Sequence, residues 1–274
     1  MPVLLSGLFL AACSSSPLEN QKGVAVSAYY SDSEDKGSES DHLGLWFFDS
    51  SSGELVHRSN WKDSRELAST FFPLPQGSYL VVLGANLDSP LEIAGEDSPQ
   101  SLSYTLDEAS PRQVFSSCTE LKDYVPSRIV NLNLNLNRVT AELAVDIQGA
   151  PQGLETVVEA VNCAAAFYPA EKNPQGSWGK PSEQAKSVTF SSKSALLMPT
   201  ASGREWSFFH LTLTTAEGVS FESFIEAPRM DAGARYLMSL KYDEIQSFMH
   251  LSSCPVSDWT EGWVYEGDIT DPVN

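Results

Sequence analysis

Alternation of apolar and polar residues runs along much of this chain and predicts an all-β protein. In residues 130–137, one valine and three leucines alternate with four asparagines, a period that places one set of side chains on a buried face and the other in water. The alternation resumes after Arg138 in the opposite phase, with Val139 and Ala141 facing inward. Because a slip of one residue turns every side chain over, we expect a bulge or turn at Asn137-Arg138, and a crossover between two domains there.

Most other ordered segments are predicted as short strands separated by turn residues. Leu43 to Phe48 and Glu54 to His57 form a predicted hairpin around the turn at Asp49 to Gly53. One helical turn is predicted at Glu108 to Phe115, and no sustained period of 3.6 residues is present. Many short strands with turn signals about every 8–12 residues are typical of β-sandwiches. The remaining expected strands are residues 24–30, 79–85, 101–106, 114–116, 157–167, 187–190, 195–198, 206–214, 219–225 and 236–242, with 206–214 and 219–225 as a hairpin.

The N-terminus has the pattern of a lipoprotein signal peptide. Leu4 to Ala12 is a small and apolar stretch that ends in the lipobox Leu10, Ala11, Ala12 and Cys13, followed by three serines. The stretch is about half of the roughly 20 apolar residues that a transmembrane helix needs. We therefore predict that Cys13 is lipidated and becomes the first residue of the mature protein.

This reading predicts four segments along the chain. Residues 1–12 are the signal peptide, 13–23 a lipidated tether, 24–138 an N-terminal β-sandwich domain and 139–274 a C-terminal β-sandwich domain. A signal peptide usually opens with lysine or arginine, and Met1 to Val3 has neither. This leaves open that translation begins upstream, and the interpretation of Cys13 is the same in both cases.

Charge and motif content argue against nucleic-acid binding and catalysis. The chain has 36 acidic and 17 basic residues and a net charge of −19, whereas phosphate backbones need a basic footprint. The four histidines are widely separated, and no metal, nucleophile or phosphate-loop motif is present. We expect no catalytic site, no metal site and no cofactor. The acidic run Ser31 to Asp41 is interpreted as a solvated loop.

Three cysteines remain after lipidation, and their pairing is open. The spacings of Cys118, Cys163 and Cys254 fit no CxxC motif or metal knuckle. A disulfide between Cys163 and Cys254 is slightly favoured because both lie in the second half. Three buried apolar thiols are an equally good interpretation.

Two features suggest binding. Trp61, Trp178, Trp259 and Trp263 lie among polar residues, either as a glycan- or protein-binding surface or as caps on the ends of the sandwich cores.

The chain also ends in a one-sided strand pattern. Trp263, Tyr265 and Ile269 share one parity within residues 262–270. Such a strand completes its own sheet or is donated to the edge of a neighbour's sheet.

In succession, these motifs resemble the fimbrillin-type lipoproteins of Bacteroidales, and among them the fimbrial anchor, or minor fimbrial accessory, subunits of type V pili. The resemblance covers the whole chain in order. It rests on Leu10 to Cys13, Leu43 to Asp49 with Gly53, Leu74 to Val82, Leu136 to Val145, Arg235 to Leu240 and Asp258-Trp259.

The resemblance implies two transthyretin-like β-sandwich domains in tandem, attachment to the outer membrane through the lipid on Cys13, and binding of pilin subunits by strand exchange. In the best-known members of this family, shaft and tip subunits lose their first strand to an arginine-specific protease, whereas the anchor keeps its lipidated N-terminus. No arginine precedes Arg58 here, although Lys22 and Lys36 would suit a lysine-specific protease. We therefore expect an uncut, surface-exposed anchor subunit. The alternative is a surface glycan- or host-binding lipoprotein of the same fold.

Overall fold

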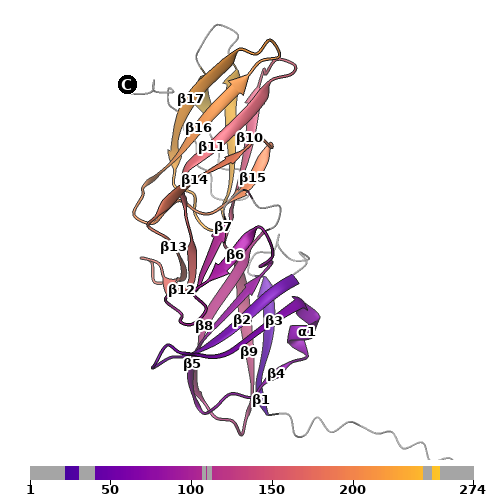
Figure 1. The fold of residues 1–274 in the computed structure, drawn as a ribbon, viewed down its shortest axis with the longest axis vertical. Coiled ribbons are helices and arrows are strands. Elements are labelled where there is room, and N and C mark those ends of the chain that lie inside the picture. The colour runs from indigo at the N-terminus through magenta and orange to yellow at the C-terminus, as the bar shows by residue number, and fades with distance from the viewer. Residues whose placement is uncertain (1–21, 31–40, 107–108, 110–112, 243–248, 254–274) are drawn as a thin grey trace, which may run out of the picture.

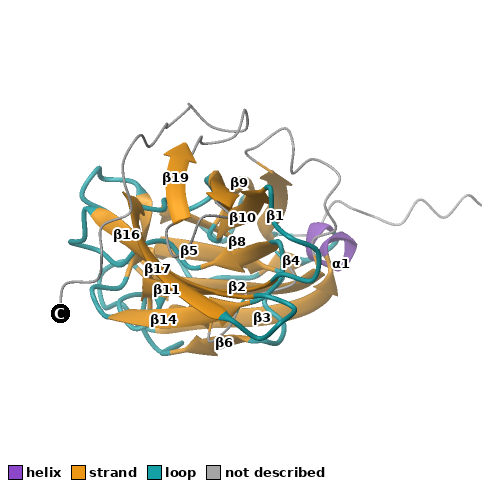
Figure 2. Ribbon diagram, turned by 90° about the horizontal axis from the view of Figure 1, so that it is seen from above, coloured by secondary structure: helices purple, strands orange, loops and turns teal. Residues whose placement is uncertain are grey.

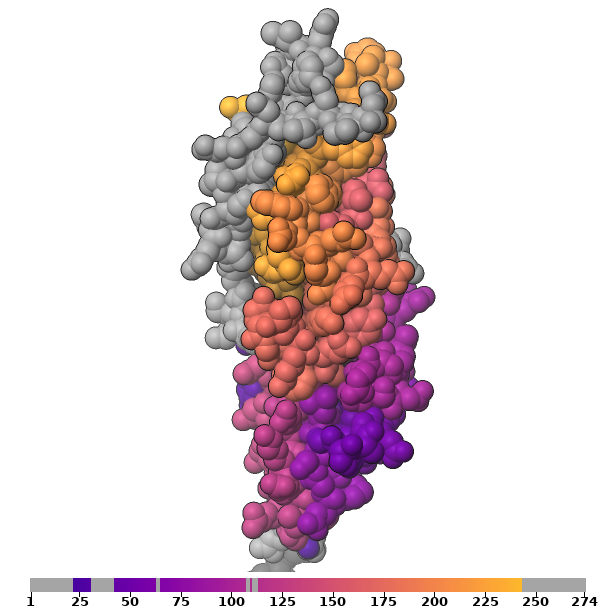
Figure 3. Space-filling view, turned by 90° about the vertical axis from the view of Figure 1, so that its left-hand side faces the viewer, coloured from indigo at the N-terminus to yellow at the C-terminus, as the bar shows by residue number. Residues whose placement is uncertain are grey.

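The computed structural model describes residues 22–30, 41–106, 109, 113–242 and 249–253, and within these ranges the chain is almost entirely β-strand. The molecule is elongated, with the first half of the chain at one end and the second half at the other (Figures 1 and 3). Its strands lie in stacked layers (Figure 2). The predicted all-β class is thus confirmed.

The N-terminal end is built around a seven-stranded sheet with the order β3-β2-β5-β8-β9-β1-β4, folded into two layers. Only Phe115 with Arg138 and Ser116 with Asn137 link β8 to β9, and the two layers enclose a core that includes Val24, Phe47 and Leu134. The leucines of the alternating segment face this core and its asparagines face outward, as predicted. The elements are β1 (Gly23–Tyr30), β2 (Asp41–Asp49), β3 (Leu55–Asp63), α1 (Ser64–Ala68), β4 (Phe71–Phe72), β5 (Gly77–Ala85), β8 (Phe115–Tyr124) and β9 (Ile129–Arg138).

The C-terminal end consists of two four-stranded sheets, β15-β10-β18-β19 and β14-β11-β16-β17. Strand β10 runs parallel to β18, just as β1 runs parallel to β9 at the other end. In each half of the chain, the first strand therefore pairs in parallel with a strand near the end of that half. The strands are β10 (Ala141–Gln148), β11 (Glu155–Ala164), β14 (Ala185–Phe190), β15 (Ser194–Leu197), β16 (Trp206–Thr214), β17 (Ser220–Pro228), β18 (Arg235–Tyr242) and β19 (Met249–Ser253).

A further four-stranded sheet combines strands from both halves. Its order is β13-β12-β7-β6, with β6 (Leu91–Ala94) and β7 (Ser103–Leu106) from the first half and β12 (Phe167–Lys172) and β13 (Trp178–Pro181) from the second. Trp46 and Phe48 of β2 belong to the same buried cluster as Phe167, whereas Phe47 belongs to the N-terminal core. Strand β2 is therefore buried on both faces, which explains the unbroken apolar run from Leu43 to Phe48.

The phase change after β9 is a crossover between sheets. Arg138, Val139, Thr140 and Ala141 are all buried, because the chain passes from the N-terminal layers directly into β10. Arg138 donates a hydrogen bond to the carbonyl of Gly233, which anchors the crossover to the C-terminal end. The proposed division of the chain at residues 138 and 139 coincides with the end of β9 and stays a prediction.

Several elements differ from expectation. The short helix α1 was not predicted, and β3 continues to Asp63 rather than stopping at His57. Phe115, expected to end a helical turn, begins the ten-residue strand β8. The predicted strand at residues 157–167 is two strands, β11 and β12, which belong to different sheets. Pairing with distant strands decided these boundaries, and local propensity does not encode it.

Candidate functional site

Most residues singled out from the sequence lie outside the described ranges. These are Leu10, Ala11, Ala12 and Cys13 of the lipobox, Trp263, Tyr265 and Ile269 of the candidate donor strand, and Cys254. Their roles stay predictions. The described residues instead show the state of the first strand, the position of Arg58 and the surroundings of the remaining cysteines and tryptophans.

Strand β1 is an integral part of the N-terminal sandwich. It pairs with β9 along its whole length, from Gly23 opposite Ile129 to Tyr30 opposite Leu136. The side chain of Val24 is fully buried in the core. On its other side β1 pairs only briefly with β4, at Val24 and Ala25. Removing β1 would therefore expose core side chains and leave one edge of β9 without its partner.

Arg58 lies in the middle of β3, in register with Trp46 of β2. Its Nε is 2.6 Å from Oε2 of Glu96, and the indole Nε1–H of Trp46 donates to the same carboxylate oxygen at 2.7 Å. Cleavage after Arg58 would separate β1, β2 and the first part of β3 from the rest of the chain. The first arginine of the sequence therefore lies within a paired strand and not in a linker between strands.

Cys118 and Cys163 are free thiols in the structure. Cys163 is 1% exposed, and burial raises its thiol pKa to about 12. Burial likewise raises the pKa of Cys118 well above its usual value. Both residues therefore fit the interpretation of the cysteines as buried, apolar and unreactive thiols. The predicted pairing of Cys163 with Cys254 stays a prediction, because Cys254 lies outside the described residues.

We expect neither Cys118 nor Cys163 to react with a thiol reagent at pH 8 in the folded Cys13→Ser chain, because only the accessible thiolate is nucleophilic. Labelling with Ellman's reagent before and after denaturation measures this. Rapid labelling of the native protein at either residue would contradict the expectation. If Cys163 pairs with Cys254, its labelling after denaturation will require a reductant.

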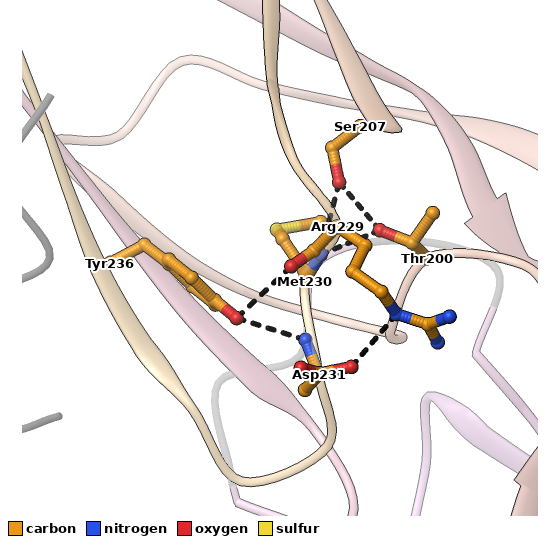
Figure 4. A network of polar contacts seen from close by, with 6 residues as sticks. All are labelled: Thr200, Ser207, Arg229, Met230, Asp231 and Tyr236. Carbon is orange, nitrogen blue, oxygen red and sulfur yellow. Dashed lines mark hydrogen bonds and ion pairs between the residues drawn. The ribbon is translucent and has the colours of Figure 1, made fainter. Parts of the chain in front are cut away.

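A buried polar network joins the loop after β15 to the loop between β17 and β18 (Figure 4). The hydroxyl oxygens of Thr200 and Ser207 are 2.5 Å apart, and the backbone N–H of Met230 donates to both, at 2.7 and 3.1 Å. The hydroxyl of Tyr236 accepts the backbone N–H of Asp231 at 3.0 Å, and burial raises its pKa. These hydroxyls hold backbone groups in place, so the network is structural.

The two described tryptophans from the sequence prediction have different surroundings. Trp61 packs against the N-terminal core, with its ring centroid 5.7 Å from that of Phe72, which agrees with its interpretation as a core cap. Trp178 lines a polar cleft of about 510 Å³ together with Asp49, Gln100 and Lys122. Lys172 Nζ lies 4.5 Å from the centroid of the Trp178 ring, so a cation already covers one face of the ring.

The pKa of Asp49 in this cleft is lowered to about 2, chiefly by the hydrogen bond from the hydroxyl of Ser51. Its carboxylate is therefore ionised at neutral pH. It accepts local bonds from the turn, including the backbone N–H groups of Ser51 and Ser52. This arrangement is an Asx turn.

An exposed aromatic surface on β16 and β17 was not predicted from the sequence. Trp206 and Phe208 of β16 and Phe224 of β17 are 45%, 40% and 41% exposed. Their exposure follows from the strand pairing, which places them on the outer face of the β14-β11-β16-β17 sheet. The available signal was that Trp206, Phe208 and Phe209 place aromatic rings on both parities of a strand otherwise buried on one face only.

Within the described ranges, no helix is long and apolar enough to span a membrane. In the same part of the chain, no group of three or more metal-ligating side chains is gathered.

The architecture is that of elongated β-sandwich proteins found in Bacteroidales. No family model and no curated protein sequence matches the chain. Among solved structures, the fimbrial anchor protein Mfa2 from Porphyromonas gingivalis has a TM-score of 0.55 at 16% identity, covering 88% of this chain and 98% of that one. A fimbrial assembly protein from Parabacteroides distasonis has a TM-score of 0.51 at 10% identity, covering 83% and 92%.

A protein from Bacteroides thetaiotaomicron proposed to bind polysaccharide has a TM-score of 0.59 at 13% identity, covering 89% of this chain and 98% of that one. The chain therefore has the fold of these three proteins over nearly their whole length. The resemblance seen in the sequence is confirmed at the level of the fold.

Proposed function

We propose that this protein is a lipid-anchored accessory subunit that holds or nucleates a fimbria-like adhesin at the outer membrane. Its fold is shared with a fimbrial anchor protein and a fimbrial assembly protein. The lipid on Cys13 supplies the attachment, and two or three acyl chains make such attachment stable. Neither catalysis nor a cofactor has a part in this role.

The observation that carries the proposal is the state of β1. This strand is buried, paired in full with β9 and continuous in sequence with the tether that begins at Cys13. No arginine occurs between Cys13 and β1, and the first one, Arg58, belongs to β3. An arginine-specific protease would therefore leave a lipid on Cys13 covalently joined to the folded body. A subunit that must lose its first strand to open an acceptor groove has the opposite requirement.

The pilin contact is proposed to use the C-terminal segment. In the β15-β10-β18-β19 sheet, β19 is one of the two edge strands, and residues 254–274 follow it directly in the sequence. Trp263, Tyr265 and Ile269 would fill alternate pockets of the partner's groove, while main-chain hydrogen bonds extend its sheet.

Deleting residues 262–274 is expected to abolish co-purification with a fimbrial pilin, while the body keeps its folded β-sheet signal. Pull-down of the tagged full-length chain and of the truncated chain, together with circular dichroism, measures both. The matched control is Glu266→Gln/Asp268→Asn, which changes the other parity and should retain binding. Undiminished pilin binding by the folded, truncated chain would eliminate the donor-strand proposal.

Glycan binding is the competing function, favoured by the polar cleft beside Trp178. Glycan-array binding that disappears in Trp178→Ala, with pilin binding intact, would select this alternative. Trp61 is a poorer stacking platform because its ring packs on Phe72.

A further inference from the structure

The outer face of the β14-β11-β16-β17 sheet concentrates the exposed apolar side chains of the C-terminal half. Trp206 and Phe208 on β16 and Phe224 on β17 are each at least 40% exposed, and Val157 and Val161 of β11 are exposed beside them. Atoms of β16 and β17, orange to yellow in Figure 3, form surface in the upper half of the molecule. Contiguous exposed apolar surface of this kind marks an interaction site on a soluble protein.

Carboxylates surround these rings. Strand pairing places Phe208 opposite Glu226 and Thr212 opposite Glu222, and Glu159 opposite His210. We call Trp206, Phe208, Phe224, Glu159, Glu222 and Glu226 the aromatic-acidic face. Strands β11, β16 and β17 contain no lysine or arginine. The fourth strand of the sheet, β14, contributes Lys186, and His210 of β16 lies between Glu159 and Glu222.

His210 contacts both an aromatic ring and two carboxylates of the face. Its ring stacks on Phe224 with centroids 4.3 Å apart and an angle of 4° between the planes. Its Nδ1 is 3.5 Å from Oε2 of Glu159, and its Nε2 is 3.6 Å from Oε2 of Glu222. The stack fixes the orientation of Phe224, so the aromatic surface is organised before any partner arrives.

Charge decides which occupants suit this face. The C-terminal segment of this chain, residues 254–274, has five carboxylates and no lysine or arginine, and like charges would oppose its docking. A second copy of the chain, with a net charge of −19, meets the same repulsion. The complementary occupant combines positive charge with apolar side chains.

We propose that the aromatic-acidic face docks an extended, basic and apolar segment of another protein. Arginine or lysine side chains of that segment pair with Glu222 and Glu226 and lie over the exposed rings, where cation–π attraction adds to the ion pairs. Its apolar side chains cover Trp206 and Phe208. This contact is separate from the C-terminal donor strand and does not depend on it.

The test uses two labelled synthetic dodecapeptides, one alternating lysine with leucine and one alternating glutamate with leucine. Fluorescence anisotropy with the full Cys13→Ser chain should show binding of the lysine peptide, weakened by added salt, and little binding of the glutamate peptide. Trp206→Ala/Phe224→Ala and, separately, Glu222→Gln/Glu226→Gln should each weaken the lysine peptide about tenfold or more, a loss typical of interface hot spots.

Matched controls separate docking from general attraction to an acidic protein. Tyr29→Ala removes an even more exposed aromatic ring on β1, and Glu92→Gln removes an exposed carboxylate on β6. Both should bind the lysine peptide as the parent does.

Equal weakening by face and control variants would overturn the proposal, as would equal affinity for the two peptides. Binding of a neutral glycan that is lost in Trp206→Ala/Phe224→Ala, without peptide binding, would identify the face as a lectin surface instead. The peptide-binding test of the aromatic-acidic face does not depend on the result of deleting residues 262–274, so the two proposals can fail separately.

Discussion

Replacement of Cys13 by serine is expected to move the protein from the membrane fraction to the soluble fraction. The thiol is the only group of the lipobox that accepts the diacylglyceryl chain, and the remaining apolar stretch is too short to span a bilayer. A single acyl chain binds membranes marginally, whereas lipoprotein modification supplies two or three. Fractionation with immunoblotting, combined with labelling by a clickable palmitate analogue, measures both location and lipid.

Cys118→Ser is the matched control for the lipidation test. Cys118 lies on β8 with a half-buried side chain, so its replacement should leave both lipid label and membrane location unchanged. A Cys13→Ser chain that still sediments with membranes and retains the label would refute the lipid anchor. It would leave the fold and the aromatic-acidic face untouched.

Replacement of Trp46 by alanine is expected to lower the free energy of unfolding by about 3–5 kcal/mol, the usual cost of truncating a buried large aromatic residue. Trp46 is fully buried and packs with Tyr104 of β7 at a centroid distance of 6.5 Å. Its indole N–H also donates to Glu96. Because β7 is shared with β12 in one sheet, the cavity would lie where the two halves of the chain meet. Urea unfolding followed by circular dichroism measures the change.

Two further variants calibrate the Trp46 result. Trp46→Phe keeps an aromatic ring and loses the bond to Glu96, so it should cost less than alanine does. Val56→Ala, at an exposed position of β3, should change the free energy of unfolding by no more than about 0.5 kcal/mol. A loss below about 1 kcal/mol in Trp46→Ala would mean that the layer between β2 and the shared sheet contributes little to stability.

The two surfaces proposed for binding place different demands on partners. The donor segment offers main-chain hydrogen bonds and apolar side chains to a groove, and the aromatic-acidic face offers rings and carboxylates to a basic segment. The donor segment follows β19, at one edge of the β15-β10-β18-β19 sheet, whereas the aromatic-acidic face belongs to the β14-β11-β16-β17 sheet. One subunit could thus hold a pilin and a second protein together.

The sequence alone determined the strand character of this protein and the parity of its strands. In β9, the leucines point inward because burial removes their apolar surface from water, and the asparagines point outward. This alternation depends only on the residue types within the strand. The hairpin of β16 and β17 was equally readable, because a short turn at Ala216 to Gly218 joins two alternating segments. The lipobox at Cys13 is likewise a local pattern.

Only the tertiary structure decided which faces are covered. Trp61 lies among polar residues in the sequence yet packs on Phe72, whereas Trp206 begins an apolar strand and is exposed. The shared sheet pairs Tyr104 with Phe167, residues so far apart in sequence that no local signal connects them. Burial of a side chain depends on which distant strand packs against it. The residues of a strand determine which side chains alternate between its two faces. Which element packs against each face depends on the tertiary fold of the whole chain.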